Sequence, residues 1–107
     1  MKNILIICQG GMSSSVLAKK TTEYLKEKGN DIQVEATSTN EGRNMIEKGK
    51  YDLYLVSPQT KMYYEQLKKT GERSGKKVIN IPPQAYVPVP MGIEKLSNLI
   101  LQELPES

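Results

Sequence analysis

Cys8 is the only cysteine of this chain, and it stands where an apolar run stops and a helical pattern begins. A stretch rich in glycine and serine follows at once, Gln9-Gly10-Gly11-Met12-Ser13-Ser14-Ser15. The first amides of a helix are unpaired, and the positive end of its dipole lowers the free energy of a nearby negative charge. This position is therefore suited to a thiolate and to a phosphoryl group bound to it.

The glycines and serines after the cysteine have the properties of an anion-binding loop. Gly10 and Gly11 lack a Cβ atom, so the backbone can turn sharply there and a ligand can approach closely. The hydroxyls of Ser13, Ser14 and Ser15 offer a helix N-cap and further hydrogen-bond donors. We expect these hydroxyls and the amides of the first helical turn to form an anion-binding nest for an S-phosphoryl group. Taken singly, a buried structural cysteine and simple helix capping are the plainer interpretations.

The absence of histidine narrows the chemistry of the site. Neither a Ser-His nor a Cys-His pair can form, so a nucleophile must be activated by its position alone. A zinc site would have to be built from carboxylates alone, and we expect no metal and no cofactor. The nucleotide-binding pattern Gly-x-x-x-x-Gly-Lys-Ser/Thr does not occur in the sequence. In a cysteine phosphatase with the pattern Cys-x5-Arg, the arginine would stand at Ser14, so transfer of a phosphoryl group is favoured over its hydrolysis.

Short β-like runs alternate with amphipathic stretches along the chain, in the order βαβαβαβα. The expected strands are residues 3–7, 32–36, 53–56 and 77–81. The first helix is expected from Met12 or Ser13 to Lys28, where Gly29-Asn30 ends it, and the second from caps at residues 37–40 to Lys48. Pro58 is expected at the first position of a third helix, residues 70–75 as a polar turn, and residues 92–104 as the last helix. The proline-rich residues 82–90 exclude regular helix or a central strand.

Such alternation predicts one three-layer α/β domain over residues 1–107, with a four-stranded parallel sheet covered by helices on both faces. The expected strand order is 2-1-3-4, similar to that of small cysteine phosphatases. Ligands bind such sheets at the carboxyl edge, where the strand order reverses between strands one and three. Cys8 and the segment Ser57-Pro58-Gln59 both end strands at that point.

Composition excludes several classes of partner. Hydrophobic residues make up 37% and charged residues 25% of the 107 residues, as in a globular domain. The longest apolar run is far shorter than the roughly 18 residues that span a bilayer, and the first residues do not resemble a secretory signal. The net charge of +3 comes from lysines interspersed with glutamates. We therefore expect a cytoplasmic protein that neither inserts into a membrane nor binds nucleic acid.

At these residues the sequence resembles the IIB components of the sugar phosphotransferase system, of the lactose/cellobiose/diacetylchitobiose class. The pattern Cys-x-x-Gly-Met-Ser-Ser/Thr-Ser after an apolar strand is met at residues 8–15, and Pro58-Gln59 after the third expected strand is a second match. Tyr86 matches more loosely. The resemblance implies that Cys8 becomes phosphocysteine, that residues 9–15 form the phosphate loop, and that Pro58, Gln59 and Tyr86 contact a partner.

The resemblance also implies three partners. A histidine-phosphorylated IIA protein would donate the phosphoryl group, and a sugar held by the membrane transporter IIC would receive it. Cellobiose, chitobiose, lactose or a related sugar would be the acceptor. Two alternatives stay open: a degenerate cysteine phosphatase, and a binding module in which Cys8 is only structural. Tyr54, Tyr63 and Tyr64 are of a residue type that stacks on sugars, but packing is the expected role of Tyr54 in a strand.

Overall fold

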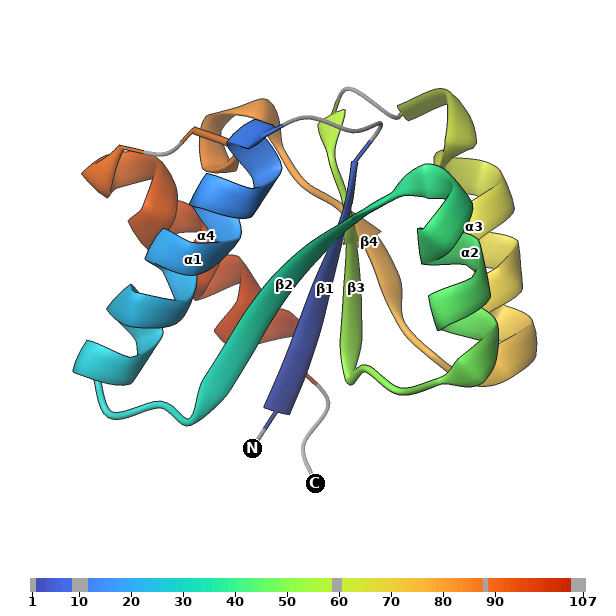
Figure 1. Ribbon diagram of the computed structural model, residues 1–107, viewed down its shortest axis with the longest axis horizontal. Helices are drawn as coiled ribbons and strands as arrows, with labels where there is room; N and C mark the ends of the chain where they lie inside the picture. The colour runs from blue at the N-terminus through green and yellow to red at the C-terminus, as the bar shows by residue number, and fades with distance from the viewer. Residues whose placement is uncertain (1, 9–11, 59–60, 88, 105–107) are drawn as a thin grey trace.

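A four-stranded parallel sheet forms the middle layer of the protein (Figure 1), seen in a computed structural model that describes residues 2–8, 12–58, 61–87 and 89–104. The strands are β1 (Lys2–Cys8), β2 (Ile32–Ser38), β3 (Leu53–Val56) and β4 (Val78–Asn80). Their order is β2-β1-β3-β4, and all three pairings are parallel. The predicted fold class and strand order are confirmed.

Helices cover both faces of the sheet (Figure 1). Helices α1 (Met12–Glu27) and α4 (Pro90–Glu103) lie on one face, and α2 (Thr39–Lys48) and α3 (Lys61–Ser74) lie on the other. A short 3-10 helix, η2 (Pro83–Ala85), connects β4 to α4 within the proline-rich segment. No helix among the described residues is long and apolar enough to cross a membrane.

Two apolar cores hold these layers together, and β1 contributes to both. Ile4 and Ile6 pack into the core beneath α1 and α4, whereas Leu5 and Ile7 pack into the core beneath α2 and α3. Successive side chains of a strand point to opposite faces, so a central strand must be apolar throughout. The run Ile4 to Cys8 is buried at every position for this reason.

Sequence signals at the helix ends are confirmed at several places. Gly29 has a φ of 87° and ends α1 with Asn30, whose N–H bonds to the carbonyl of Leu25 at 2.9 Å. Gly49, with a φ of 65°, ends α2 in the same left-handed conformation. The side chain of Ser38 accepts the N–H of Glu41 and caps the start of α2.

The predicted turn at residues 70–75 is wrong, because α3 continues to Ser74. Thr70 donates its hydroxyl to the carbonyl of Gln66 at 3.0 Å, so its polar group is satisfied inside the helix. A side chain at Gly71 would overlap Val78 of β4, so glycine allows the helix to pack closely on the strand. The helix stops only at Gly75, whose φ is 70°.

The start of the third helix also differs from the prediction. Residue 58 lies in a 3-10 turn directly after β3, and α3 begins at Lys61 rather than at Pro58. Proline fixes its own φ in a range that 3-10 and α-helix share, so its presence marks a helical turn without deciding which kind forms. Pro90 is instead the proline that stands at a helix start, where α4 begins two residues before the expected Gly92.

The open edge of β2 is covered by a threonine of α1. The hydroxyl oxygen of Thr22 accepts the N–H of Val34 at 2.9 Å and lies 2.8 Å from the carbonyl of Ala18, to which it can donate. Val34 is thereby satisfied on the side of β2 that has no neighbouring strand. Covering such groups protects an edge strand from pairing with another chain.

Tyr54 is the largest fully buried side chain among the described residues, which confirms packing as its role and excludes stacking on a sugar. Its hydroxyl donates to the carbonyl of Met45 at 3.0 Å and accepts the N–H of Tyr51 at 3.2 Å. It thus ties β3 to the end of α2 and to the turn that precedes the strand. Burial raises the pKa of Tyr54 above its ordinary value of 10.0.

Replacement of Tyr54 by phenylalanine should lower the free energy of unfolding by about 1–3 kcal/mol, because two partly buried backbone groups lose their partner. The raised pKa of Tyr54 also predicts how stability changes at alkaline pH. Below about pH 10 the Tyr54 hydroxyl is neutral in both the folded and the unfolded state. Above that pH it ionises first in the unfolded state, so the free energy of unfolding falls as the pH rises. Urea unfolding between neutral and alkaline pH should show a shallower decline for Tyr54→Phe than for the wild type.

The Tyr64→Phe variant is the matched control, since that ring packs on the same core from a half-buried position. Its free energy of unfolding should stay within about 0.5 kcal/mol of the wild type. Equal losses in the two variants would contradict the role given to the Tyr54 hydroxyl.

Candidate functional site

Cys8 is the last residue of β1, at the carboxyl edge of the sheet. It pairs in register with Ser38 of β2, and Ile7 before it pairs with Val56 of β3. The N–H of Ser57 donates to the carbonyl of Ile7 at 2.9 Å, so the end of β1 is held from the β3 side as well. The thiol therefore projects from a fixed backbone at the point where the strand order reverses.

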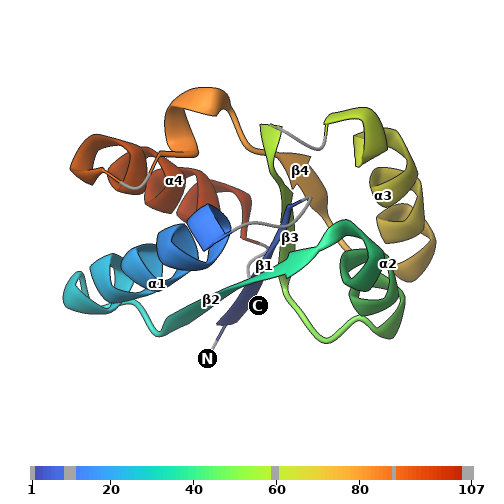
Figure 2. The ribbon, with the colours of Figure 1, turned by 45° about the horizontal axis from the view of Figure 1, so that its top comes forward.

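Helix α1 begins only four residues after Cys8, which brings its first turn to the same edge of the sheet (Figure 2). That turn contains no acidic residue, whereas the first turn of α2 contains Glu41. The positive end of the α1 dipole is thus not neutralised by a side chain of its own first turn. The start of a helix with this composition is suited to bind an anion.

Tyr86 lies far from Cys8 in the sequence but contacts it in the structure. Its hydroxyl donates a hydrogen bond to the Cys8 sulfur, with an oxygen to sulfur distance of 3.1 Å, across 78 positions of sequence. The Cys8 side chain is fully buried in this arrangement, with 0% of its surface exposed. The sequence predicted Tyr86 as a partner contact, and the structure adds a direct bond to the thiol.

The connection between β4 and α4 fixes the position of Tyr86. It directly follows η2, its N–H bonds to the carbonyl of Pro83 at 3.2 Å, and its ring packs on the core beneath α1 and α4. Ala85 is buried beside it, and the prolines of the segment restrict the backbone. On the far side, Gly92 of α4 allows the carbonyl of Val87 to approach so closely that a side chain at that position would overlap it. The hydroxyl is therefore positioned by a packed segment.

The structure describes the predicted phosphate loop in part. Gln9, Gly10 and Gly11 lie outside the described residues. Met12, Ser13 and Ser14 occupy the first turn of α1, and only their backbone is described. Ser15 has an exposed side chain and lines a groove between α1 and β2.

The structure also describes only part of the predicted segment Ser57-Pro58-Gln59 after β3. Pro58 is half-buried directly after the fully buried Ser57, and Gln59 lies outside the described residues. Because Ser57 is bonded to Ile7, this segment stands beside the end of β1 as expected.

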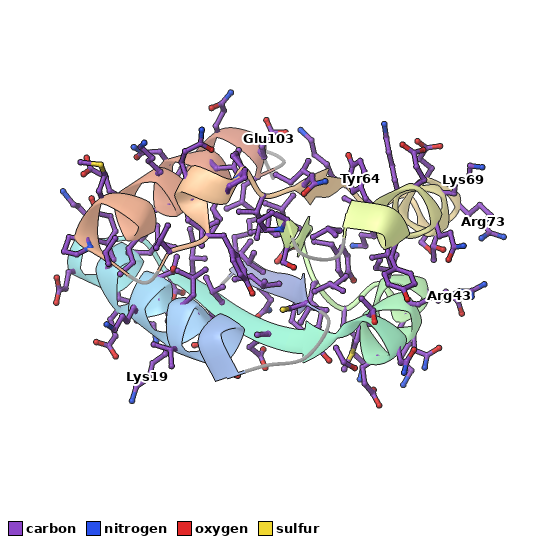
Figure 3. The ribbon with its side chains drawn as sticks, turned by 90° about the horizontal axis from the view of Figure 1, so that it is seen from above. Lys19, Arg43, Tyr64, Lys69, Arg73 and Glu103 are labelled. Atoms are coloured by element: carbon purple, nitrogen blue, oxygen red, sulfur yellow. The ribbon has the colours of Figure 1, made fainter. Side chains whose placement is uncertain are left out.

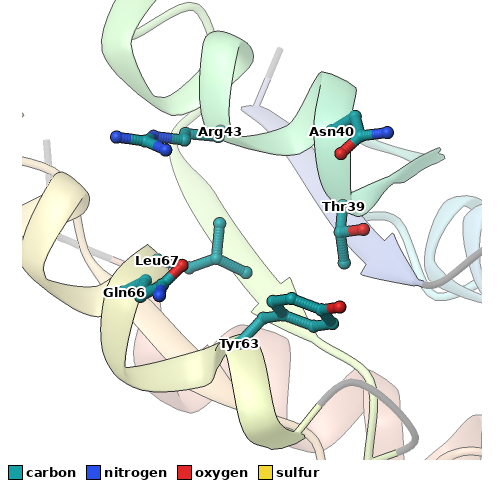
Figure 4. A pocket seen from close by; sticks show the side chains of 6 residues that line it. All are labelled: Thr39, Asn40, Arg43, Tyr63, Gln66 and Leu67. Carbon is teal, nitrogen blue, oxygen red and sulfur yellow. The ribbon is translucent and has the colours of Figure 1, made fainter.

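Neither arginine of the chain lies in the cysteine loop. Arg43 belongs to α2 and Arg73 to the last turn of α3, and both side chains are exposed on the α2 and α3 layer (Figure 3). Arg43 instead borders a pocket of about 290 Å³ between the two helices (Figure 4). The residues that line this pocket are Thr39, Asn40, Arg43, Tyr63, Gln66 and Leu67, and neither Cys8 nor Tyr86 is among them.

No group of acidic, histidine or cysteine side chains among the described residues could hold a metal ion. A described side chain that bonds to the thiol is the neutral hydroxyl of Tyr86, which sequence reasoning did not connect to the sulfur. The available signal was topological, because Tyr86 follows the fourth strand and therefore reaches the same carboxyl edge as Cys8.

Comparison with known proteins gives a consistent result. Residues 3–98 match the family described as "PTS system, Lactose/Cellobiose specific IIB subunit". The chain is 30% identical over 86 residues to the oligo-beta-mannoside-specific EIIB component of Bacillus subtilis, covering 80% of this chain and 82% of that protein. It is 27% identical over 85 residues to the lactose-specific EIICB component of Streptococcus mutans, covering 79% of this chain but 15% of that longer protein.

Two solved structures share the fold. The lactose-specific IIB domain from Streptococcus pneumoniae has a TM-score of 0.80 at 21% identity, covering 94% of this chain and 95% of that one. The cellobiose-specific IIB component from Borrelia burgdorferi has a TM-score of 0.71 at 26% identity, covering 94% and 89%. The α/β arrangement with its parallel sheet is thus the one found in these IIB structures.

Gly92→Ala should displace the segment that carries Tyr86, because the added methyl group overlaps the Val87 carbonyl. We expect the free energy of unfolding to fall by about 1–3 kcal/mol, although alanine is the better helix former. Denaturant unfolding measures the change. Asn98→Ala, at an exposed position of the same helix, is the control and should change stability by about 0.5 kcal/mol or less. A stabilised Gly92→Ala variant would contradict the close approach.

Proposed function

This chain belongs to the lactose/cellobiose-specific IIB family of the sugar phosphotransferase system, and from that membership we propose that Cys8 carries a phosphoryl group between two partners. The observation that supports this most is the place of the only cysteine. It ends the central strand at the carboxyl edge, beside the start of a helix whose first turn has no acidic residue. Such a place favours both the thiolate and a dianionic phosphoryl group.

The donor in this proposal is a phosphohistidine of a IIA protein. The Cys8 thiolate attacks phosphorus in line, the S–P bond forms as the N–P bond breaks, and the imidazole leaves with the electron pair and takes up a proton. Positioning and electrostatic stabilisation of the transferred group supply most of the catalysis. The absence of histidine from this chain fits the scheme, because the histidine belongs to the partner.

The acceptor is a sugar bound by a IIC transporter. A sugar hydroxyl oxygen attacks phosphorus, the S–P bond breaks, and the electron pair returns to sulfur while the hydroxyl proton passes to solvent. The similar chains named EIICB join IIC and IIB in one polypeptide, which supports a IIC partner here. Names of the similar proteins include lactose, cellobiose and an oligo-beta-mannoside, so we propose a disaccharide or short oligosaccharide, with transfer on the cytoplasmic side.

The loop composition supports transfer rather than hydrolysis. Both arginines lie on α2 and α3, and Ser14 stands where a cysteine phosphatase would place its arginine. Without a bidentate guanidinium, attack by water gains little stabilisation from this site. A phosphocysteine can then persist until an acceptor arrives.

We propose that IIA docks on the carboxyl edge around Cys8, at Pro58, Gln59 and the segment after Tyr86. Val87, Val89 and Met91 expose apolar side chains there, and 67% of the Met91 surface is accessible. Exposed apolar groups beside a reactive residue are typical of a protein contact. Because Tyr86, which precedes them, bonds to the thiol, docking on this segment would also cover Cys8, exclude water and align the two reacting groups.

Incubation with a phosphorylated IIA partner should add one phosphoryl group to the wild-type protein, and Cys8→Ser should gain none. Intact-mass spectrometry measures both. Asn98→Ala, at an exposed position of α4 outside the proposed site, is a control that keeps the thiol and should still be phosphorylated. An unchanged wild-type mass with a competent donor, or an equal gain in Cys8→Ser, would refute the carrier function. Steady hydrolysis of an aryl phosphate that depends on Cys8 would favour the phosphatase alternative instead.

A further inference from the structure

We propose that the Tyr86 hydroxyl is a hydrogen-bond donor to the reacting sulfur, which stabilises the Cys8 thiolate both when it attacks phosphorus and when it leaves. This inference rests on the proposed phosphoryl transfer at Cys8. It assigns to Tyr86 a part in the reaction itself, separate from the partner contact expected from the sequence.

The distance and the burial carry the inference. The Tyr86 oxygen lies 3.1 Å from the Cys8 sulfur, and the Cys8 side chain has no exposed surface. A hydrogen bond to a charged acceptor favours the charged form, and its effect is larger where water is excluded. The bond from the Tyr86 hydroxyl is stronger when the sulfur is a thiolate and weaker when the sulfur is a neutral thiol.

The composition of the site makes such a donor useful. The chain has no histidine, and its arginines lie on α2 and α3. Neither side chain type is then available beside the sulfur, and the Tyr86 hydroxyl is a dipole that can stabilise charge there, together with the amides at the start of α1. During transfer to the sugar the electron pair of the S–P bond returns to sulfur, and a donor already in place there requires no reorganisation.

The placement of Tyr86 indicates preorganisation. Its backbone directly follows η2 and its ring packs on the core, while the hydroxyl reaches the strand end. Packing alone would explain the ring, since phenylalanine would fill the same space. It does not explain why the polar end is directed to the sulfur of the only cysteine.

The charged and titratable groups around the sulfur determine how the reactivity of Cys8 depends on pH. Of the described residues paired or bonded with Cys8, Ser38 faces it from β2 and Tyr86 from the segment before α4, and only Tyr86 is titratable. On the β3 side the neighbours of the strand end are Val56 and Ser57, which carry no charge. Glu41 in the first turn of α2 is exposed and follows Ser38 by three positions.

The test is the pH dependence of alkylation of Cys8 by iodoacetamide in the wild type and in Tyr86→Phe. Only one cysteine can react, so the rate reports on this sulfur alone. Loss of the donor should move the midpoint of the profile to higher pH by about one unit, which is roughly a tenfold lower thiolate fraction on the acid side. At alkaline pH the variant should react at least as fast, because a more basic thiolate is the stronger nucleophile.

This pattern separates the hydrogen bond from simple shielding. A change in access alone scales the whole profile and leaves its midpoint in place. Tyr24→Phe is the matched control, because that half-buried ring packs on the same core from the far part of α1, and its midpoint should equal that of the wild type. Circular dichroism confirms that each variant is folded. A Tyr86→Phe midpoint equal to the wild type would overturn the inference.

The carrier function and the role of Tyr86 can fail independently. Alkylation needs no partner, so a shifted midpoint together with no uptake of a phosphoryl group would refute the carrier function and keep the hydrogen bond. Normal phosphorylation with an unshifted midpoint would refute the role of the hydrogen bond and keep the carrier function. If both hold, the rate of transfer from phosphorylated IIA to Tyr86→Phe should fall about tenfold at neutral pH, and the Tyr24→Phe rate should not change.

Discussion

Parallel pairing of β1 with a neighbour on each side is the constraint on which the rest of the structure depends. The pairing requires a strand that is apolar on both faces, and it brings the ends of all four strands to one edge. Two separate cores form against the same strand, so the thiol at its end is held from both layers. This arrangement fixes the backbone at Cys8, so only the side chain of Cys8 can change conformation.

A second constraint concerns the groups that surround the sulfur. In the proposed function, Cys8 must bind its phosphoryl group firmly enough to prevent loss and weakly enough to release it to the next acceptor. The amides at the start of α1 and the Tyr86 hydroxyl would supply a moderate stabilisation of this kind, whereas a guanidinium would bind the group more strongly. This balance would suit the proposed transfer from a donor protein to a sugar.

Much of the fold follows from the sequence because its signals are local. The alternating pattern predicted all four strands and their order, and Gly29 marked the end of α1 by a conformation that glycine adopts easily. The errors came from tertiary packing. We predicted a turn at residues 70–75 because they are polar and include Gly71, but Gly71 instead allows α3 to pack closely on Val78. Cys8 was identified by its neighbours in sequence, whereas its bond to Tyr86 joins residues 78 positions apart and no local pattern encodes it.

The central claim is that a phosphoryl group on Cys8 is held at the carboxyl edge by the start of α1 and its neighbours. Amide NMR spectra recorded before and after phosphorylation test it most directly. We predict that the large shifts are confined to residues 8–15 and to residues near Ser38, Ser57 and Tyr86. Residues at the opposite edge, such as Asp31 and Asp52, should not move. Large shifts centred away from the carboxyl edge, or the same changes in Cys8→Ser, would contradict the account.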